Sequence, residues 1–180
     1  MSAFHKTALF IDGLNLHFTA KALGFDIDFK RLLAEFARHG TLVRAYYYTA
    51  IFEDAGYNTI RPLTDWLSYN GFTVVTKSAR EHNDGEGRRT FKRNIGVELS
   101  VDAIELAKHV DQIVLFSGDR DLRRLVEAIQ GRGCRVMVVS SLRTSSPMIA
   151  DELRRQADEF LELDNLRAII GRTLPSDAAQ

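Results

Sequence analysis

The sequence predicts an α/β fold, a three-layer α/β/α sandwich with a mainly parallel central sheet. Two patterns support this prediction. Short apolar runs of strand length look buried on both faces, which is typical of parallel sheets, and stretches with helical periodicity separate them. Strands that alternate with helices indicate βαβ units with right-handed crossovers, so helices are expected on both faces of the sheet.

The strands are expected at five apolar runs, and a sixth, shorter run extends the sheet near the carboxyl end of the chain. Each run is bounded by Gly, Asp, Ser or a helical pattern. In chain order the runs span residues 7–12, 42–50, 72–78, 112–118, 134–141 and 159–163.

The helices are expected between these runs, at residues 14–23, 28–40, 59–71, 94–110 and 121–133. Asp28 is a favourable N-cap for the second helix, and Gly40 and Gly71 are expected to stop the helices that precede them. A further helix is expected before the last strand, with Ser146 as its cap and Pro147 as its first residue.

One segment, residues 79–93 (AREHNDGEGRRTFKR), does not follow this alternation. It has no clear period, and it is rich in glycine and arginine. We therefore expect a long exposed loop. Loops of this length inside compact domains are usually functional or mobile.

The length of 180 residues suits one domain, which we place at residues 1–170, followed by a flexible tail at 171–180. The 24 basic and 24 acidic residues balance, so no global positive field indicates nucleic-acid binding. The apolar stretch near the amino terminus is shorter than the core of a signal peptide, and no apolar run has the length of a transmembrane helix. A cytoplasmic protein without a membrane partner is expected. The single cysteine, Cys134, has apolar neighbours and is expected to be a buried thiol.

Carboxylates occur where one crevice of such a sheet could collect them. Asp12 ends the first strand, Glu98 and Asp102 lie four apart on one helix face, and Asp119 and Asp121 follow the strand at 112–118. Like charges so close either share protons or hold a divalent cation. Oxygen ligands without accompanying Cys or His favour Mg²⁺ or Mn²⁺ over zinc.

Each acid also has a purely structural interpretation. Asp12 and Asp119 are favourable helix N-caps, and Asp-Gly is common in turns. Acids four apart on a helix usually form a solvated face. Here the flanking residues Val97, Leu99, Val101 and Ala103 are apolar, which favours an enclosed face instead.

Three motifs resemble those of the NYN domain, in its bacterial LabA-like branch, which belongs to the PIN-like nuclease superfamily. They read FIDGLNL, GVELSVDAIELA and VLFSGDRDLRRLVEAIQGRGCRVMVV, and the resemblance spans residues 7–164. It implies a metal-dependent ribonuclease with a site built from acids. Asp12 and Asn15 match the family's D-x-x-N turn, Asp119 and Asp121 match its S-G-D-x-D turn, and Asp102 matches its helix aspartate.

Glu98 departs from the family pattern. The family more often has aspartate in a K-G-V-D element, where this chain reads N-I-G-V-E. Glutamate keeps the charge and lengthens the reach, so metal binding survives in principle. The lysine is replaced by Asn94 or Ile95, and Arg93 is the candidate substitute for its phosphate contact.

From the motifs we assign roles in RNA phosphodiester hydrolysis. Asp12, Glu98 and Asp119 are the expected direct or water-mediated ligands of Mg²⁺ or Mn²⁺. Asp102 and Asp121 orient coordinated water, Asp121 being counted with the metal site. Asn15 and Ser117 position water or a phosphate oxygen; alternatively Asn15 only caps the first helix and Ser117 only shapes the turn.

Substrate binding is assigned to the strongest local excess of positive charge. It comprises Lys77, Arg80, Arg88, Arg89, Lys92 and Arg93, which outnumber the acids among them. Phosphates are attracted to such a patch, although a solvated loop of mixed charge is the alternative. Phe91 and Tyr46–Tyr48 could stack on unpaired bases, but core packing is favoured for the tyrosines. The expected partner is single-stranded or loop RNA. A homodimer is a further possibility that the sequence leaves undecided.

Rival functions make different demands on the sequence. A non-catalytic RNA-binding or regulatory protein would keep the acids as a structural ion site or as helix caps. An aspartyl phosphatase of the haloacid type needs Asp-x-Asp after the first strand, where this chain has DGLN. A flavodoxin-like nucleotide binder needs a phosphate-cradling first loop, and DGLNLH is poor for that purpose.

Overall fold

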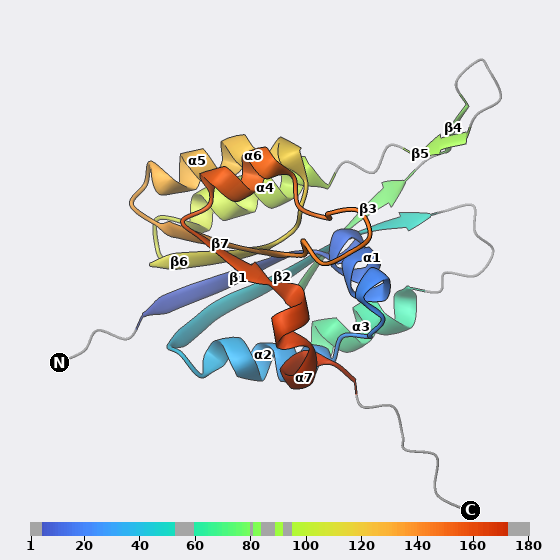
Figure 1. The fold of residues 1–180 in the computed structure, drawn as a ribbon, viewed down its shortest axis with the longest axis horizontal. Helices are drawn as coiled ribbons and strands as arrows, with labels where there is room; N and C mark the ends of the chain where they lie inside the picture. The colour runs from blue at the N-terminus through green and yellow to red at the C-terminus, as the bar shows by residue number, and fades with distance from the viewer. Residues whose placement is uncertain (1–4, 53–59, 80, 84–88, 92–94, 173–180) are drawn as a thin grey trace, which may run out of the picture.

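The protein is a three-layer α/β/α sandwich, as the sequence predicts (Figure 1). The structure is a computed structural model that describes residues 5–52, 60–79, 81–83, 89–91 and 95–172. Its six-stranded parallel sheet has the order β3-β2-β1-β6-β7-β8. The strands are β1 (Lys6–Asp12), β2 (Thr41–Phe52), β3 (Thr73–Ala79), β6 (Gln112–Phe116), β7 (Arg135–Ser140) and β8 (Glu159–Glu162).

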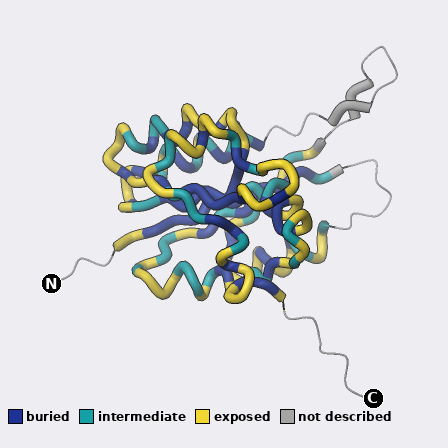
Figure 2. The backbone as a smooth tube through the Cα atoms, in the orientation of Figure 1, coloured by how far each residue is buried: buried dark blue, intermediate teal, exposed yellow. Residues whose placement is uncertain are grey.

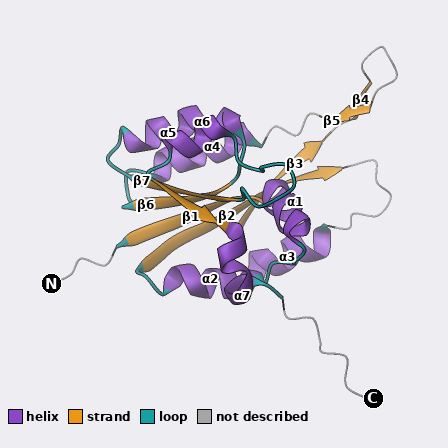
Figure 3. Cartoon of the chain, in the orientation of Figure 1, coloured by secondary structure: helices purple, strands orange, loops and turns teal. Residues whose placement is uncertain are grey.

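Different helices cover the two faces of the sheet (Figure 3). One face carries α4 (Gly96–Leu106), α5 (Arg123–Gln130) and α6 (Asp151–Gln156). The other carries α1 (Gly13–Leu23), α2 (Phe29–Ala37), α3 (Arg61–Tyr69) and α7 (Arg167–Ile170). Two 3-10 helices, η1 (Arg120–Leu122) and η2 (Leu163–Leu166), precede α5 and α7.

The central strands are buried on both faces, which explains their continuous apolar runs (Figure 2). Along β1, Ala8 and Phe10 pack toward α4 and α5, and the alternate residues Leu9 and Ile11 pack toward α1 and α2. All four side chains are fully buried. Burying a large apolar side chain contributes about 1.5–3 kcal/mol, so both core layers stabilise β1 at the centre of the sheet.

The strand order places a switch point between β1 and β6. The chain winds outward from β1 to β2 and β3, and it then returns through α4 to β6 on the other side of β1. Ligands of open α/β sheets bind in the crevice beyond the strand ends at such a point. Asp12 is the last residue of β1, and Ser117 directly follows β6.

Several predicted helix ends are confirmed. The Asp28 side chain accepts a hydrogen bond from the Arg31 backbone N–H at 3.0 Å and caps α2. Gly71 follows α3 with a φ of 92°, a left-handed conformation that glycine adopts without strain. The prediction for Gly40 is wrong, because α2 already ends at Ala37. A Cβ on Gly40 would lie 2.2 Å from the His5 carbonyl oxygen, so a close backbone approach requires this glycine.

The segment expected as a loop contains secondary structure. β3 extends to Ala79, and β4 (Glu81–Asn83) pairs antiparallel with β5 (Arg89–Phe91). Each of these strands has only 3 residues, which is too short for an alternating apolar pattern to indicate it in the sequence.

The predicted start of the helix before β8 is also wrong. α6 begins at Asp151, and Ser146 accepts a hydrogen bond from the Thr144 hydroxyl through its carbonyl instead of capping a helix. The preceding segment braces the turn after β6, because the Ala150 N–H donates to the Gly118 carbonyl at 2.9 Å. A tertiary contact with Gly118 thus replaces the first turn expected from Pro147.

At the carboxyl end, Gly171 forms an antiparallel bridge with Ile27, and the Arg172 N–H donates to the Asp26 carbonyl at 2.8 Å. The rest of the expected tail, residues 173–180, lies outside the described residues. Within the part of the chain that the structure describes, no helix has the length and apolar character needed to cross a bilayer.

Candidate functional site

A hydrogen-bond network joins the ends of β1 and β6. The Asp12 carboxylate accepts from the Asn15 backbone N–H at 3.1 Å, which caps α1, and from the Ser117 hydroxyl at 3.3 Å. The Asn15 side-chain oxygen accepts from the Gly118 N–H at 3.1 Å. Asn15 and Ser117 thereby fix the two strand ends relative to each other. This is an organising role as well as a potential substrate contact.

Asp119 faces Asp12 across this junction. Its N–H donates to the Ser117 hydroxyl oxygen at 3.3 Å, and its carboxylate accepts from the Asp121 N–H at 3.0 Å and caps η1. The capping interpretation and the proximity to Asp12 therefore both hold for Asp119. Asp121 takes part in this network only through its backbone N–H, and the residue is exposed to solvent.

The environment of Asp12 disfavours its charge. Burial raises the pKa of the Asp12 carboxyl above its usual 3.8, and the nearby charge of Asp119 raises it further. The hydrogen bonds from Asn15 and Ser117 act in the opposite direction. A cation next to both carboxylates would relieve the burial and repulsion penalties together.

A pocket of about 230 Å³ opens beside these carboxylates. Asp12, Asn15 and Asp119 form its polar wall. Its apolar and backbone lining comes from α1, η1 and the amino-terminal end of α4, through Leu14, Phe18, Ile95, Gly96, Leu99 and Leu122. The pocket therefore gathers carboxylates from two strand ends at the switch point.

Glu98 lies apart from the Asp12–Asp119 pair. Its carboxylate forms an ion pair with Lys77 of β3, with Nζ and Oε1 2.8 Å apart. The hydrogen bond from Lys77 lowers the pKa of Glu98 below its usual 4.5. The other carboxylate oxygen, Oε2, is buried without a hydrogen-bond partner. Glu98 thus keeps one carboxylate oxygen available to a further ligand.

Asp102, one turn along α4, is held by Tyr48. The Tyr48 hydroxyl donates to Asp102 Oδ2 at 2.8 Å, and Tyr48 pairs with Asp12 in the β1–β2 register. Burial, and then Asp102, raise the pKa of the Tyr48 hydroxyl above its ordinary range, so this side chain remains a donor. Tyr48 of β2, the strand that pairs with β1, therefore positions Asp102.

The flanks of these helix acids differ from the prediction. Leu99 and Ala103 are buried, as expected, but Val97 and Val101 are more than half exposed. An apolar neighbour in sequence points to a different helix face, so it does not enclose the acids. Glu98 and Asp102 are nevertheless held against the sheet, by Lys77 and Tyr48.

The predicted ligand set is gathered only in part. Among the described residues, no three His, Cys, Asp or Glu side chains come close enough together to hold a metal ion. In this arrangement the carboxylates of Asp12, Glu98, Asp119 and Asp121 do not form one such cluster, and Lys77 holds Glu98. Their assignment to one metal site stays a prediction. Asp12 and Asp119 still fit a hard cation, because Mg²⁺ commonly uses one or two carboxylates together with water and phosphate.

The predicted phosphate-binding residues divide into two groups. Lys77 is described, and it pairs with Glu98. Arg80, Arg88, Lys92 and Arg93 lie outside the described residues, and only the backbone of Arg89, in β5, is described. For the tyrosines, core packing is confirmed: Tyr47 and Tyr48 are buried, and Tyr46 stacks on Phe10 with ring centroids 5.0 Å apart.

Two features of the site were absent from the sequence prediction. The Tyr48–Asp102 hydrogen bond was missed because the tyrosines were assigned to the core. Gly118 was also overlooked, although a Cβ there would lie 1.7 Å from the Met148 carbonyl oxygen. The glycine between Ser117 and Asp119 was the available signal, since close backbone approach is one reason for glycine at a turn.

The fold and the acids at its switch point define an α/β protein with a candidate anionic site at the carboxyl ends of its parallel strands. The chain belongs to the NYN domain family, whose family model matches residues 6–164 and which is of the PIN-like nuclease type. It is similar to the low amplitude and bright protein LabA of Synechococcus elongatus, with 35% identity over 172 residues, 93% of this chain and 89% of that protein. It also resembles the crystal structure of a protein of unknown function from Vibrio parahaemolyticus. That likeness has a TM-score of 0.77 and 27% identity and covers 96% of this chain and 99% of the other.

Proposed function

We propose that the protein hydrolyses RNA phosphodiester bonds with Mg²⁺ or Mn²⁺ held at Asp12 and Asp119. The observation that carries this proposal is the carboxylate pair at the ends of neighbouring strands, where the Ser117 hydroxyl donates to the Asp12 carboxylate and accepts from the Asp119 backbone N–H. The pair lies at the switch point of a NYN domain. Such an arrangement leaves negative charge facing a pocket, which suits a cation that also binds a phosphate.

The donor chemistry agrees with a hard cation. Carboxylate and amide oxygens from Asp12, Asp119 and Asn15 line one pocket, and the orphaned Glu98 Oε2 lies on the same helix as the wall residues Ile95 and Leu99. A bound Mg²⁺ or Mn²⁺ supplies a Lewis acid that polarises a phosphoryl oxygen and acidifies water. Ser117 and Asn15 hold the Asp12 carboxylate in place, so the protein provides a prearranged anionic wall.

The test is cleavage of a mixture of structured and unstructured RNA with Mg²⁺, with Mn²⁺ or with EDTA. Wild-type protein should cleave only with the cation. Asp119→Asn should abolish cleavage and keep the fold, because asparagine can still cap η1. Asp65→Asn, at an exposed position of α3, is the matched control and should cleave like wild type. Wild-type rates for Asp119→Asn would exclude this site.

Substrate binding by the segment around β4 and β5 is part of the same proposal. If Arg88, Arg89, Lys92 and Arg93 contact phosphates, neutralising them should weaken RNA binding similarly for all sequences. For single-stranded RNA, each phosphate interaction that is removed should flatten the slope of log affinity against log salt by about 0.7. An unchanged slope would move the RNA path elsewhere on the surface, with Arg120, Arg123 and Arg143 as the next candidates.

A second candidate is RNA binding without cleavage. The observation that favours it is the ion pair of Lys77 with Glu98, which neutralises an acid that the family resemblance assigns to the metal site. The same RNA mixture separates the two functions. A pure binding protein would retain RNA equally with Mn²⁺ and with EDTA, and it would leave the RNA intact.

A further inference from the structure

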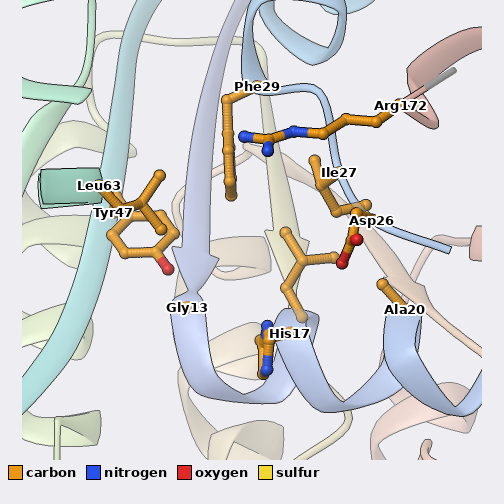
Figure 4. A pocket seen from close by; sticks show the side chains of 10 residues that line it. Gly13, His17, Ala20, Asp26, Ile27, Phe29, Tyr47, Leu63 and Arg172 are labelled. Carbon is orange, nitrogen blue, oxygen red and sulfur yellow. The ribbon is translucent and has the colours of Figure 1, made fainter. Parts of the chain in front are cut away.

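A second pocket lies on the opposite face of the sheet from α4, between α1, β2 and the start of α2 (Figure 4). Its volume is about 200 Å³. The lining includes Tyr47 and Phe29, with His17, Asp26 and Arg172 as further polar groups. None of these side chains belongs to the predicted metal-binding or catalytic residues.

Tyr47 gives this pocket an unused hydrogen-bond donor. The residue is only 2% exposed, and its side chain reaches the pocket beside Gly13 (Figure 4). No hydrogen bond joins its hydroxyl to the described residues, and Tyr47 lines the pocket, so the hydroxyl can donate to a ligand there. Burial raises the pKa of this hydroxyl to about 12, with Asp12 adding to the effect, so it stays protonated at neutral pH.

Gly13 keeps the space for the tyrosine ring. A Cβ at this position would lie 2.4 Å from Tyr47 Cζ and 2.6 Å from its hydroxyl oxygen. The glycine therefore admits Tyr47 to the end of β1. Gly13 lines this pocket, and the residue before it, Asp12, lines the pocket of the carboxylate pair. The two pockets are thus adjacent along the chain at the end of β1.

The lining favours one uncharged planar ring. Leu16, Ala20, Ile27 and Leu63 form apolar walls, and the Phe29 ring packs edge-on against Tyr47 with centroids 5.5 Å apart. Asp26 supplies a negatively charged acceptor and Arg172 supplies positively charged donors. Together they suit a neutral ring that carries both donors and acceptors. Pockets for drug-sized ligands hold about 300–1,000 Å³, so this smaller pocket fits a single ring system.

We propose that this pocket binds one nucleobase of the RNA strand whose phosphate lies at Asp12 and Asp119, with the Tyr47 hydroxyl donating to an acceptor of the base. The proposal rests on the proposed RNA substrate. Arg172 extends across the pocket toward Phe29 and Asp26 lies at the same rim, so both can reach the hydrogen-bonding edge of the base (Figure 4). The protein would then select cleavage positions by base, which phosphate contacts alone cannot do.

The test is an NMR titration of the full chain with each of the four ribonucleosides, in EDTA. Nucleosides carry no phosphate, so they do not engage the proposed cation site. We expect amide shifts at Gly13, His17 and Ile27, with one or two nucleosides preferred. Ribose alone should give none of these shifts. The absence of shifts with every nucleoside at millimolar concentration, or equal shifts with ribose, would overturn the proposal.

Two variants test the contacts. Tyr47→Phe keeps the ring and should weaken nucleoside binding by about two- to tenfold, the effect of one hydrogen bond. Arg172→Ala changes an exposed rim residue and should also weaken binding, without a risk to the core. Tyr69→Phe, at a residue that is 90% exposed, is the matched control and should bind like wild type. Wild-type affinity in both Tyr47→Phe and Arg172→Ala would overturn the proposal.

The nucleoside test and the cleavage test can fail separately, so the two proposals are distinguishable. Nucleoside binding without RNA cleavage would support the base pocket and contradict the nuclease. Cleavage without nucleoside binding would do the reverse. If both activities are present, Tyr47→Phe should change which bases flank the cleaved bonds, and an unchanged cleavage pattern would contradict the assigned contact.

Discussion

Two groups of carboxylates lie along the same edge of the sheet, and different kinds of neighbour hold them. At the β1–β6 junction, backbone N–H groups and a serine hydroxyl hold Asp12 and Asp119. On α4, a lysine holds Glu98 and a tyrosine holds Asp102. Neutral donors orient a carboxylate and leave its net charge in place, whereas a lysine compensates the charge. The junction therefore retains more capacity for a cation than α4 does.

The pKa values of Asp12 and Glu98 are shifted in opposite directions, in agreement with this difference between the junction and α4. Burial and a second carboxylate raise the pKa of Asp12, and an ammonium group lowers the pKa of Glu98. Opposite shifts in two acids of one predicted site indicate that their environments are specialised differently. Substitutions that exchange or remove these environments can sharpen the comparison.

Among the substitutions that test this comparison, the largest effect is expected for Asp12→Asn, beside the loss of cleavage expected for Asp119→Asn. The substitution keeps the α1 cap and removes the buried charge. Cation-dependent RNA cleavage should fall at least about 100-fold, because loss of even an indirect partner of a metal ligand typically costs 10- to 100-fold. Asp28→Asn alters the equivalent cap of α2 and should leave cleavage unchanged. If Asp12→Asn and Asp28→Asn cleaved RNA at the same rate, Asp12 would act only as a helix cap and would not belong to the cation site.

A smaller effect is expected when Lys77 is replaced. Lys77→Met should release the Glu98 carboxylate and raise Mn²⁺ affinity by up to about fivefold, since an exposed ion pair is worth at most about 1 kcal/mol. Calorimetric titration of Mn²⁺ measures this change. Adding Glu98→Gln to Lys77→Met should cancel the gain. A gain that persists in the double variant would mean that Glu98 is not the acid that Lys77 restrains.

Tyr48→Phe should affect stability more than metal binding. It removes the donor to Asp102 and should lower the free energy of unfolding by about 0.5–1.5 kcal/mol, the usual net worth of a hydrogen bond. Urea denaturation measures the loss. Tyr46→Phe, at a less buried neighbouring ring, is the control. A sharp fall in Mn²⁺ affinity for Tyr48→Phe would instead assign Asp102 to the cation site.

The smallest effects are expected in the pH dependence of stability, measured by urea denaturation in EDTA. Because the folded pKa of Asp12 is raised, ionised Asp12 costs stability as the pH rises through that pKa. Asp12→Asn should thus be more stable than wild type at neutral pH, and the difference should vanish below about pH 3.8, the usual pKa.

The Glu98 pKa is lowered, so its contribution is present above the usual 4.5 and is lost as the pH falls through the folded pKa. Glu98→Gln should be slightly less stable than wild type at neutral pH, by less than about 1 kcal/mol, because the pair is exposed. Equal signs for Asp12→Asn and Glu98→Gln would contradict the comparison.

The sequence by itself determined the layered fold, and it predicted the location of the candidate site. Apolar runs of strand length can be buried only inside a sheet covered on both faces, and helical periods supply the covers. Asp12 and Asp119 followed from position, since Asp12 ends one buried strand, Asp119 lies in the turn after another, and parallel strands end at one edge. The caps at Asp12, Asp28 and Asp119 were equally local, because a cap contacts a backbone N–H two or three residues away.

Only the tertiary structure decided which partner each acid and each ring has. Lys77 meets Glu98, and Tyr48 meets Asp102 across 54 residues, because β2, β3 and α4 are packed together. Gly13 admits Tyr47 for the same reason, since the β1–β2 register pairs Tyr47 with Ile11, two residues before Gly13. Local sequence fixes which backbone groups a side chain can reach, but partners distant in sequence depend on register and packing, which are properties of the whole fold.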